Sequence, residues 1–384
     1  MSSRGAVPVS DAKVVLLTNF IAPYRIPMLE AVADRVGDLR VWVSTLMETN
    51  RPWRPESGSL RIEVQRSLEF QHQSRHPHGY TERQIVHLPY DTMSRLRRER
   101  PDIVVSAEFG ARTVQAALYC AASSTPLVIW ATVSESSEKG RGRARRLLRR
   151  ALLPRADAVL VNGRSGARYV GALGAQADRV VTVPQTSALP EVATAGDSAR
   201  RKARCLLYVG QLIERKGIVP FVAALGRWGR RHPGERVALE LVGDGPEAPR
   251  LARVPLPGNV TVRRSGTVAY HRLARAYAQA SLFTFPTLAD EWGLVVNEAM
   301  AAGLPVLGSI YSQAVEELVQ DGVSGWVFRP SDPAALDAVL ERTLAVEAPE
   351  LARMGAAAQD AVRHLTPELA ADRLVEGLCI AAGR

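Results

Sequence analysis

The stretch LFTFPTLADEWGLVVNEAMAAGLPVLGS, residues 282–309, has the pattern of a strand, a loop, a helix and a second strand. Residues 282–287, LFTFPT, begin with aliphatic, aromatic and β-branched residues, which is typical of a buried strand. Gly293 indicates a tight loop, and the mostly apolar residues 294–302 after it indicate a helix. A chain that alternates strands and helices in this way predicts a parallel α/β sheet with helices on both faces.

The same alternation occurs on both sides of one segment that lacks periodic hydrophobicity and is rich in Ser, Thr, Ala and Pro. We therefore expect two Rossmann-like, doubly wound parallel-sheet domains that face each other across a cleft. The expected divisions are a first domain over residues 1–185, a linker over 186–203, a second domain over 204–366, and a C-terminal helix over 367–384 that packs back across the domains.

Composition excludes several classes of protein. The 384 residues are 46% hydrophobic and 23% charged, which suits two globular domains of ordinary size. The 3 cysteines are odd in number and widely spaced, which argues against a disulfide framework or a zinc site of paired cysteines. No run approaches the roughly 20 apolar residues of a membrane span, and the first dozen residues lack an apolar signal core. We expect a cytoplasmic protein.

The formal net charge of +10 points to an anionic partner. Residues 139–153 mix arginines with leucine pairs, and two interpretations stay open for them: a solvated helix face, or a peripheral contact with an anionic membrane at its inner face. Nucleic acid is not expected, because aromatic residues are not interleaved with the basic ones.

Three stretches after the linker carry residues suited to phosphate and sugar binding. In YVGQLIERKG, residues 208–217, Lys216 lies in a loop between a strand and a helix, where exposed amides and a lysine suit a phosphate group. LELVGDGPE, residues 239–247, ends a strand in a glycine-containing turn. Asp290 and Glu298 lie on either side of a helix start, where carboxylates can accept hydrogen bonds from sugar hydroxyls. The alternatives are a solvated lysine, and carboxylates that only cap and decorate the helix.

These motifs together resemble the donor-binding half of the retaining glycosyltransferases of family 4, which have the GT-B fold. The resemblance covers residues 205–330, in the series VGQLIERKG, LVGDGPE, DEWGLVVNEAMAAGLPVLGS and AVEELVQDGVSGWVF. It implies a metal-independent, hexosyltransferase-type enzyme (EC 2.4). Such an enzyme moves a sugar with retention from a UDP- or GDP-type donor to an acceptor hydroxyl, and it needs no cofactor.

The resemblance also implies a role for individual residues. Lys216, Asp290 and Glu298 are the expected catalytic residues: Lys216 neutralises the donor diphosphate, Asp290 holds hydroxyls of the transferred sugar and Glu298 holds the ribose. The remaining expected donor-binding residues are Gly210, Gln211, Arg215, Gly243, Trp292, Gly293 and Leu294.

Two departures from the family pattern bear on activity. Gln211 stands where relatives have an arginine, and Asp290 is one methylene shorter than the usual glutamate. A glutamine cannot neutralise a phosphate, and Arg215 is a candidate to compensate for it. The departures keep open a catalytically retired nucleotide-sugar-binding protein. The net charge of +10 keeps open a second alternative, a basic interaction protein associated with membrane or nucleic acid.

The first half of the chain resembles the family more weakly. We expect the acceptor side to include Tyr24 and Arg25, which follow the first strand, and Thr132 and Glu135, which follow a later one. The histidines at positions 72, 76, 78 and 87 are expected to serve in a loop or at the acceptor site, and no metal site is expected.

Overall fold

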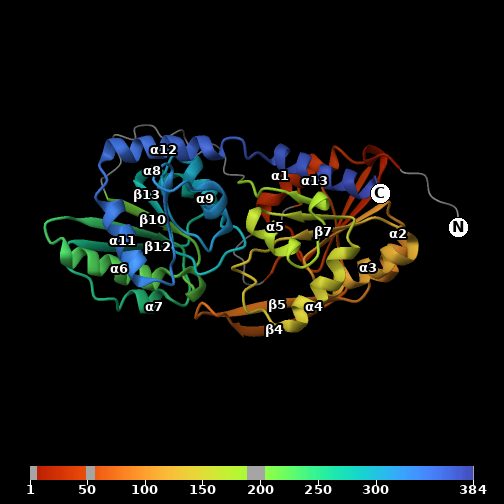
Figure 1. Ribbon diagram of the computed structural model, residues 1–384, viewed down its shortest axis with the longest axis horizontal. Coiled ribbons are helices and arrows are strands. Elements are labelled where there is room, and N and C mark those ends of the chain that lie inside the picture. The colour runs from red at the N-terminus through yellow and green to blue at the C-terminus, as the bar shows by residue number, and fades with distance from the viewer. Residues whose placement is uncertain (1–6, 49–56, 188–203, 384) are drawn as a thin grey trace. The chain divides into compact units, whose positions relative to one another are not determined.

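The computed structural model describes residues 7–48, 57–187 and 204–383, and most of the expected linker lies outside these residues. The chain divides into two compact units, shown in Figure 1. The first unit is Met1–Ser74, Arg83–Ala188 and Leu365–Arg384. The second unit is Arg75–Glu82 and Leu189–His364.

The sheet of the first unit is parallel throughout, in the strand order β3-β2-β1-β6-β7-β8-β9. Its strands are β1 (Lys13–Thr18), β2 (Asp38–Val43), β3 (Arg61–Val64), β6 (Ile103–Ala107), β7 (Leu127–Ala131), β8 (Ala158–Val161) and β9 (Val180–Thr182). Every residue of β6, β7 and β8 is buried. Burial of both faces explains why these strands are continuously apolar in sequence.

Helices cover both faces of this sheet (Figure 1). They are α1 (Ile26–Ala33), α2 (Thr92–Glu99), α3 (Ala111–Ser123), α4 (Arg143–Leu152), α5 (Arg164–Gly171) and α13 (Pro367–Ala382). Successive residues of β1 are buried on opposite faces of the sheet: Val14 lies in the core under α1 and α13, whereas Val15 lies in the core under α2 and α3. They lie on opposite faces because successive side chains of a strand point in opposite directions.

The C-terminal helix α13 belongs to the first unit although it follows the second in sequence. Leu374 and Leu378 are buried in the same core as α1. At Gly377, an added Cβ would lie 2.4 Å from Leu160 Cδ2 of β8, so the helix can approach the sheet closely only with glycine there. The apolar face of α13 thus completes one side of the first core.

The histidine-rich segment forms a hairpin, β4 (Ser67–Arg75) and β5 (Thr81–Pro89), where the sequence suggested a loop. Almost all of β4 is exposed, which explains the weak hydrophobic signal of this segment. The tip of the hairpin, residues 75–82, belongs to the second unit. We call residues 75–82 the hairpin tip.

The sheet of the second unit is also parallel, in the order β12-β11-β10-β13-β14-β15. Its strands are β10 (Cys205–Val209), β11 (Val237–Val242), β12 (Val260–Gly266), β13 (Leu282–Phe285), β14 (Val306–Ser309) and β15 (Gly325–Phe328). Its helices are α6 (Ile218–Arg231), α7 (Ala248–Leu251), α8 (Tyr270–Gln279), α9 (Leu294–Ala301), α10 (Gln313–Leu318), α11 (Pro333–Leu344) and α12 (Ala348–Val362).

The predicted architecture of two doubly wound parallel α/β sheets is confirmed. The predicted strand and helix of residues 282–302 are observed as β13 and α9. β13 ends at Phe285 because the next residue, Pro286, has no backbone N–H to continue the ladder. Among the described helices, none is both long enough and apolar enough to cross a bilayer.

Candidate active site

The loop between β13 and α9 in the second unit carries most of the expected donor-site residues. Gly293 has a φ of 104°, which favours glycine. A Cβ at this position would lie 2.6 Å from Phe285 Cε1 and 2.9 Å from Ser312 Oγ. Gly293 therefore sets the path by which the chain enters α9, and the first amides of α9 are left without partners within the helix.

Asp290 and Lys216 form a buried ion pair across this loop. Asp290 is only 8% exposed, and its Oδ2 accepts a hydrogen bond from Lys216 Nζ. Lys216 Nζ also lies 5.0 Å from the centroid of the Phe285 ring. The structure thus brings together the lysine and the carboxylate that the sequence placed 74 residues apart.

Arg215 ties the same loop to the end of β10. Its Nη1 donates to Ala289 O at 2.9 Å, and its carbonyl accepts from Leu288 N at 2.7 Å. Three carboxylates surround its guanidinium: Glu82 of the hairpin tip at 3.0 Å, Asp290 at 3.7 Å and Glu291 at 3.8 Å. Arg215 is therefore a structural anchor of the loop.

Burial and charge act in opposite directions on the titration of this cluster. Burial alone raises the pKa of Asp290, but Lys216 and then Arg215 outweigh it and hold the pKa below its usual value. Burial raises the pKa of Glu291, and Arg215 only partly offsets the rise. Burial lowers the pKa of Lys216 against the pull of Asp290. The paired carboxylate at position 290 is thus the one most strongly held in its charged form.

Glu298 lies on α9 and is 4% exposed. Its Oε2 accepts a hydrogen bond of 2.8 Å from the hydroxyl of Tyr277, a fully buried residue of α8. The sequence analysis missed Tyr277, because its position in an apolar helix pattern is equally typical of a core residue. This hydroxyl fixes the orientation of the Glu298 carboxyl group.

The remaining expected donor residues lie close to the ends of neighbouring strands. Gly210 and Gly243 follow β10 and β11, and a Cβ on Gly243 would lie 2.0 Å from Gly210 O, so the two loops touch through their backbones. The side chain of Gln211 is exposed, and its carbonyl accepts from Tyr208 Oη at 2.8 Å. The indole of Trp292 is directed inward, where Nε1 donates to Asn297 Oδ1 at 2.8 Å.

The first unit brings together only part of the expected acceptor side. Arg25 Nη2 donates to Thr132 Oγ1 at 3.3 Å, and Tyr24 lines a small hollow beside Arg25. Glu135 forms an ion pair with Arg168 in which both side chains are 50% exposed. Among the residues described, no hydrogen bond or ion pair joins Glu135 to Arg25 or Thr132.

Glu108 is an accessible carboxylate that the sequence analysis did not single out. It follows β6, next to Asn19 after β1. Desolvation by the surrounding protein raises the pKa of Glu108, and Arg112 acts against the rise. Its position after a buried strand was the signal in the sequence that could have identified it.

The histidines do not come together with carboxylates or thiols in a metal-binding group in any part of the chain that the structure describes. His78 Nδ1 lies 2.8 Å from Leu288 O, and its ring stacks on Tyr311 at 4.4 Å between centroids. His87 Nε2 lies 3.3 Å from Glu48 Oε1. His78 therefore contributes to packing of the hairpin tip within the second unit.

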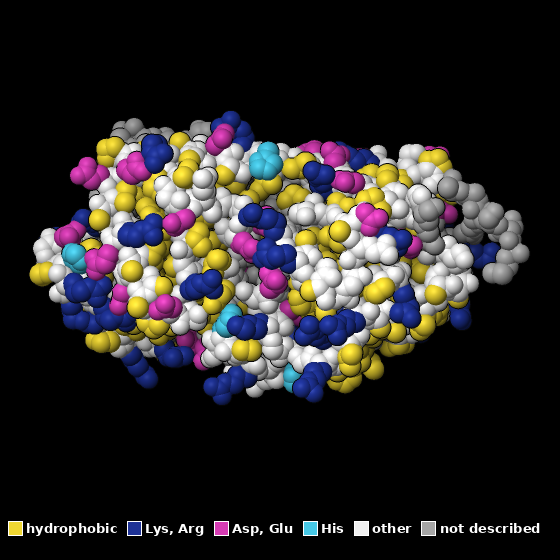
Figure 2. All heavy atoms as spheres, viewed as in Figure 1, with side chains coloured by type: hydrophobic (Ala, Val, Ile, Leu, Met, Phe, Trp, Pro, Cys, Tyr) yellow, Lys and Arg dark blue, Asp and Glu magenta, His cyan; other side chains and the backbone are white. Residues whose placement is uncertain are grey.

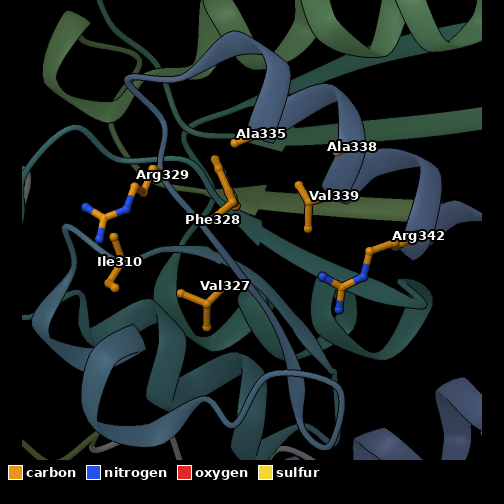
Figure 3. Close-up of a pocket in the computed structure, with 8 residues that line it drawn as sticks. All are labelled: Ile310, Val327, Phe328, Arg329, Ala335, Ala338, Val339 and Arg342. Carbon is orange, nitrogen blue, oxygen red and sulfur yellow. The ribbon is translucent and has the colours of Figure 1, made fainter.

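A separate hollow of about 370 Å³ in the second unit lies between β15 and α11, as Figure 3 shows. Its walls are mainly apolar, and the side chains of Arg329 and Arg342 lie at its two sides. Arg342 also pairs with Asp321 at 3.2 Å. The residues that line this hollow are different from those of the Lys216 and Asp290 cluster.

Both halves of the chain match families of glycosyltransferase domains. Residues 203–345 match the family described as glycosyl transferases group 1. Residues 23–186 match the family described as glycosyl transferase 4-like domain.

Two curated relatives illustrate the similarity in sequence. The D-inositol 3-phosphate glycosyltransferase of Acidothermus cellulolyticus is 31% identical over 211 residues, which are 49% of this chain and 46% of that protein. The GDP-mannose-dependent alpha-mannosyltransferase of Corynebacterium glutamicum is 28% identical over 174 residues, which are 44% of this chain and 38% of that protein. The chain thus spans less than half the length of either relative.

Solved structures are similar to the chain over nearly its whole length. HepE from Anabaena in complex with UDP has a TM-score of 0.67 at 18% identity, over 95% of this chain and 99% of that chain. The sucrose-phosphate synthase of Thermosynechococcus elongatus has a TM-score of 0.67 at 18% identity, over 95% of this chain and 98% of that chain. At such identities the likeness concerns the fold.

Proposed function

We propose that this chain, which has the GT-B fold and matches glycosyltransferase domain families in both halves, is a retaining glycosyltransferase of family 4. In this proposal it transfers a hexosyl group from a nucleotide-diphosphate sugar to an acceptor hydroxyl. The observation that carries the proposal is the buried cluster of Lys216 and Asp290 beside the start of α9, with Glu298 oriented inside that helix.

In the proposed site, the diphosphate binds near the first amides of α9 and Lys216. The helix start offers unpaired N–H groups and the positive end of the helix dipole, and the lysine adds a full charge. Protein groups of this kind can relieve the charge that develops on the departing diphosphate, so the proposed reaction needs no metal ion. Glu298 would hold the ribose hydroxyls.

In the proposed reaction cycle, the carboxylate of Asp290 exchanges Lys216 for the transferred sugar as its hydrogen-bond partner. In the structure, its Oδ2 accepts a hydrogen bond from Lys216 Nζ. When a diphosphate attracts Lys216, the carboxylate can accept hydrogen bonds from hydroxyls of the transferred sugar instead. Arg215 keeps its bond to Ala289 O and holds the loop during this exchange. We therefore assign Arg215 to positioning and not to replacement of the arginine that Gln211 lacks.

The donor is best sought among UDP- and GDP-sugars. HepE was solved with UDP, and the matched mannosyltransferase is GDP-mannose-dependent. A thermal-shift panel of UDP-, GDP-, dTDP- and ADP-sugars tests the choice, with Glu298→Ala and Asp290→Ala alongside. Stabilisation by one class of donor that Glu298→Ala abolishes supports the proposal. No shift with any nucleotide contradicts it, and a shift without any transfer of radiolabelled sugar favours a retired site.

We further propose that α4 contacts an anionic membrane surface, so that the enzyme works in the cytoplasm at the inner face of the membrane. Leu147 of α4 is 63% exposed, and the side chains of Arg143, Arg146 and Arg150 are exposed as well. Arg149 is buried against Glu138 and Tyr169, so it supports the fold instead. Figure 2 shows dark-blue and yellow side chains close together over the region of α4.

Co-sedimentation with vesicles tests the membrane proposal. Vesicles that contain phosphatidylglycerol should retain the protein, and vesicles of phosphatidylcholine alone should not. Leu147→Glu should abolish retention, whereas Leu118→Glu, at a leucine of α3 that is 59% exposed, should not. Equal loss with both variants would contradict the assignment to α4.

A further inference from the structure

A group of polar side chains lies at the carboxyl ends of three neighbouring strands of the first unit. Asn19 follows β1, Glu108 follows β6 and Thr132 follows β7. Because β6 pairs in parallel with both β1 and β7, these three residues lie at the same end of the sheet, where the strands have their carboxyl ends. Open α/β sheets bind their ligands at the carboxyl ends of their strands.

Glu108 is held in an unusual backbone conformation. Its φ is 69°, in the left-handed region that residues other than glycine rarely occupy. The backbone is secured on both sides: Glu108 N donates to Trp130 O at 2.9 Å, and Thr113 Oγ1 donates to Glu108 O at 2.8 Å. Strain that the surrounding structure maintains in this way is concentrated at functional sites.

One hydrogen bond orients the carboxylate of Glu108, and in the described part of the chain one of its two oxygens is left without a hydrogen bond. Asn19 Nδ2 donates to its Oε2 at 3.0 Å, and within the described ranges its Oε1 receives no hydrogen bond. Arg112 is 4% exposed and donates to Asn19 Oδ1 at 3.0 Å, which fixes the amide with its NH₂ group toward Glu108. Glu108 therefore presents one open oxygen that can accept from a ligand hydroxyl.

Arg25 supplies a positive charge to the same group. It donates to Thr132 Oγ1 at 3.3 Å, and its guanidinium lies 4.7 Å from the centroid of the Trp130 ring. Arg25 lies close enough to Glu108 to act against the rise in the pKa of that carboxyl group, but in residues 7–48, 57–187 and 204–383 it forms no ion pair. A half-buried arginine that is stacked on an aromatic ring and forms no direct ion pair suits a phosphate or a carboxylate.

We propose that the first unit binds an acceptor that carries both hydroxyl groups and an anionic group, with the anionic group on Arg25 and a hydroxyl on Glu108. This inference rests on the transferase function proposed above. A neutral acceptor would leave Arg25 without a direct ion pair, whereas a phosphate or a carboxylate would form charge-assisted hydrogen bonds with it. Glu108 repels the anionic group, so the two side chains together orient the acceptor.

Binding of matched sugars tests this inference directly. Glucose 6-phosphate, glucuronate and glucose are titrated by saturation-transfer NMR in the presence of saturating UDP or GDP, so that the donor diphosphate site is already filled. We expect at least one charged sugar to bind roughly tenfold or more tightly than glucose, as one charge-assisted contact allows. The comparison of glucose 6-phosphate with glucuronate distinguishes phosphate from carboxylate recognition.

Substitutions test whether Arg25 and Glu108 produce the preference for a charged sugar over glucose. Arg25→Gln should reduce the preference for a charged sugar to less than about threefold, and Arg25→Lys should retain part of it. Glu108→Gln should weaken the binding of glucose, and should weaken the charged sugars less, because it also removes the repulsion of their anionic group. Arg61→Gln, at an arginine 73% exposed in an ion pair with Asp38, is the control and should change nothing.

Three results would overturn the inference: no preference of the wild type for either charged sugar, a preference that survives Arg25→Gln, or an equal loss with Arg61→Gln. A failure of the proposed transferase function is distinguishable from these. In that case UDP and GDP themselves would not bind, or would bind without any transfer of radiolabelled sugar, whereas failure of the acceptor inference alone leaves both nucleotide binding and transfer intact. Thermal unfolding of each variant checks that it is folded.

Discussion

Tyr277→Phe removes a single hydroxyl and should destabilise the second unit. Tyr277 is 0% exposed and Glu298 is 4% exposed, and the hydroxyl donates to Glu298 Oε2 at 2.8 Å. Phenylalanine keeps the ring and its contact with Phe283, so the change is confined to the hydroxyl group. A buried hydrogen bond to a carboxylate contributes about 1.5–3 kcal/mol, and we expect the free energy of unfolding to fall by that amount.

Scanning calorimetry measures this loss. For a domain of this size the expected fall in Tm is roughly 3–12 °C. Tyr311→Phe is the matched control in the same unit, because Tyr311 Oη shares a hydrogen bond of 2.8 Å with Ser331 Oγ at an exposed position. Its expected effect is within about 0.5 kcal/mol.

A double-mutant cycle tests the reasoning itself. If the hydroxyl acts through Glu298, Tyr277→Phe should cost little in a Glu298→Ala background, and the two changes should be non-additive. The same change should raise the Kd for the nucleotide, because the carboxyl group loses its fixed orientation. An equal loss of Tm in both backgrounds, or a loss no larger than that of the control, would refute the assignment.

Three further predictions concern the loop before α9. Lys216→Met should lower kcat in a transfer assay by about 100- to 1,000-fold, as expected when one charge-stabilising donor is removed, and a fall of less than about tenfold would speak against the proposed role. Gly293→Ala should lower Tm, because its φ is 104° and a Cβ would lie 2.6 Å from Phe285, whereas Gly258→Ala, where a Cβ meets nothing within 4 Å, should not. Neighbouring cations outweigh burial and hold the pKa of Asp290 below its usual value. Its charged form therefore stabilises the fold above about pH 4, and this contribution is lost as the pH falls through the lower folded value. The difference in Tm between wild type and Asp290→Asn should accordingly be full at pH 6 and shrink in acid; a difference independent of pH would contradict the ion pair.

Local patterns in the sequence were sufficient to predict the elements and several site residues. The apolar strands β10 and β13 and the glycine-marked loops after them are visible in sequence because burial and backbone conformation are local constraints. Lys216, Asp290 and Glu298 were identified on the motifs around them. Their roles in donor binding stay predictions for the experiments above.

Local patterns in the sequence leave other features ambiguous. Tyr277 has the sequence signature of an ordinary core residue, and Glu108 has that of a solvated loop residue. Only the pairing of β6 with β1 brings Asn19 to Glu108, across 89 positions of sequence. The exposed hairpin β4–β5 lacks a hydrophobic pattern, so its strands were not expected.

The sequence by itself determined that the chain alternates strands and helices in two halves, and that phosphate-binding residue types follow the strands of the second half. The tertiary structure decided which charges meet: Lys216 with Asp290, and Arg215 with Glu82 of the hairpin tip. It also assigned α13 to the first unit. The physical reason is that hydrophobic periodicity reports where a side chain is buried, whereas its partner depends on which strands lie side by side.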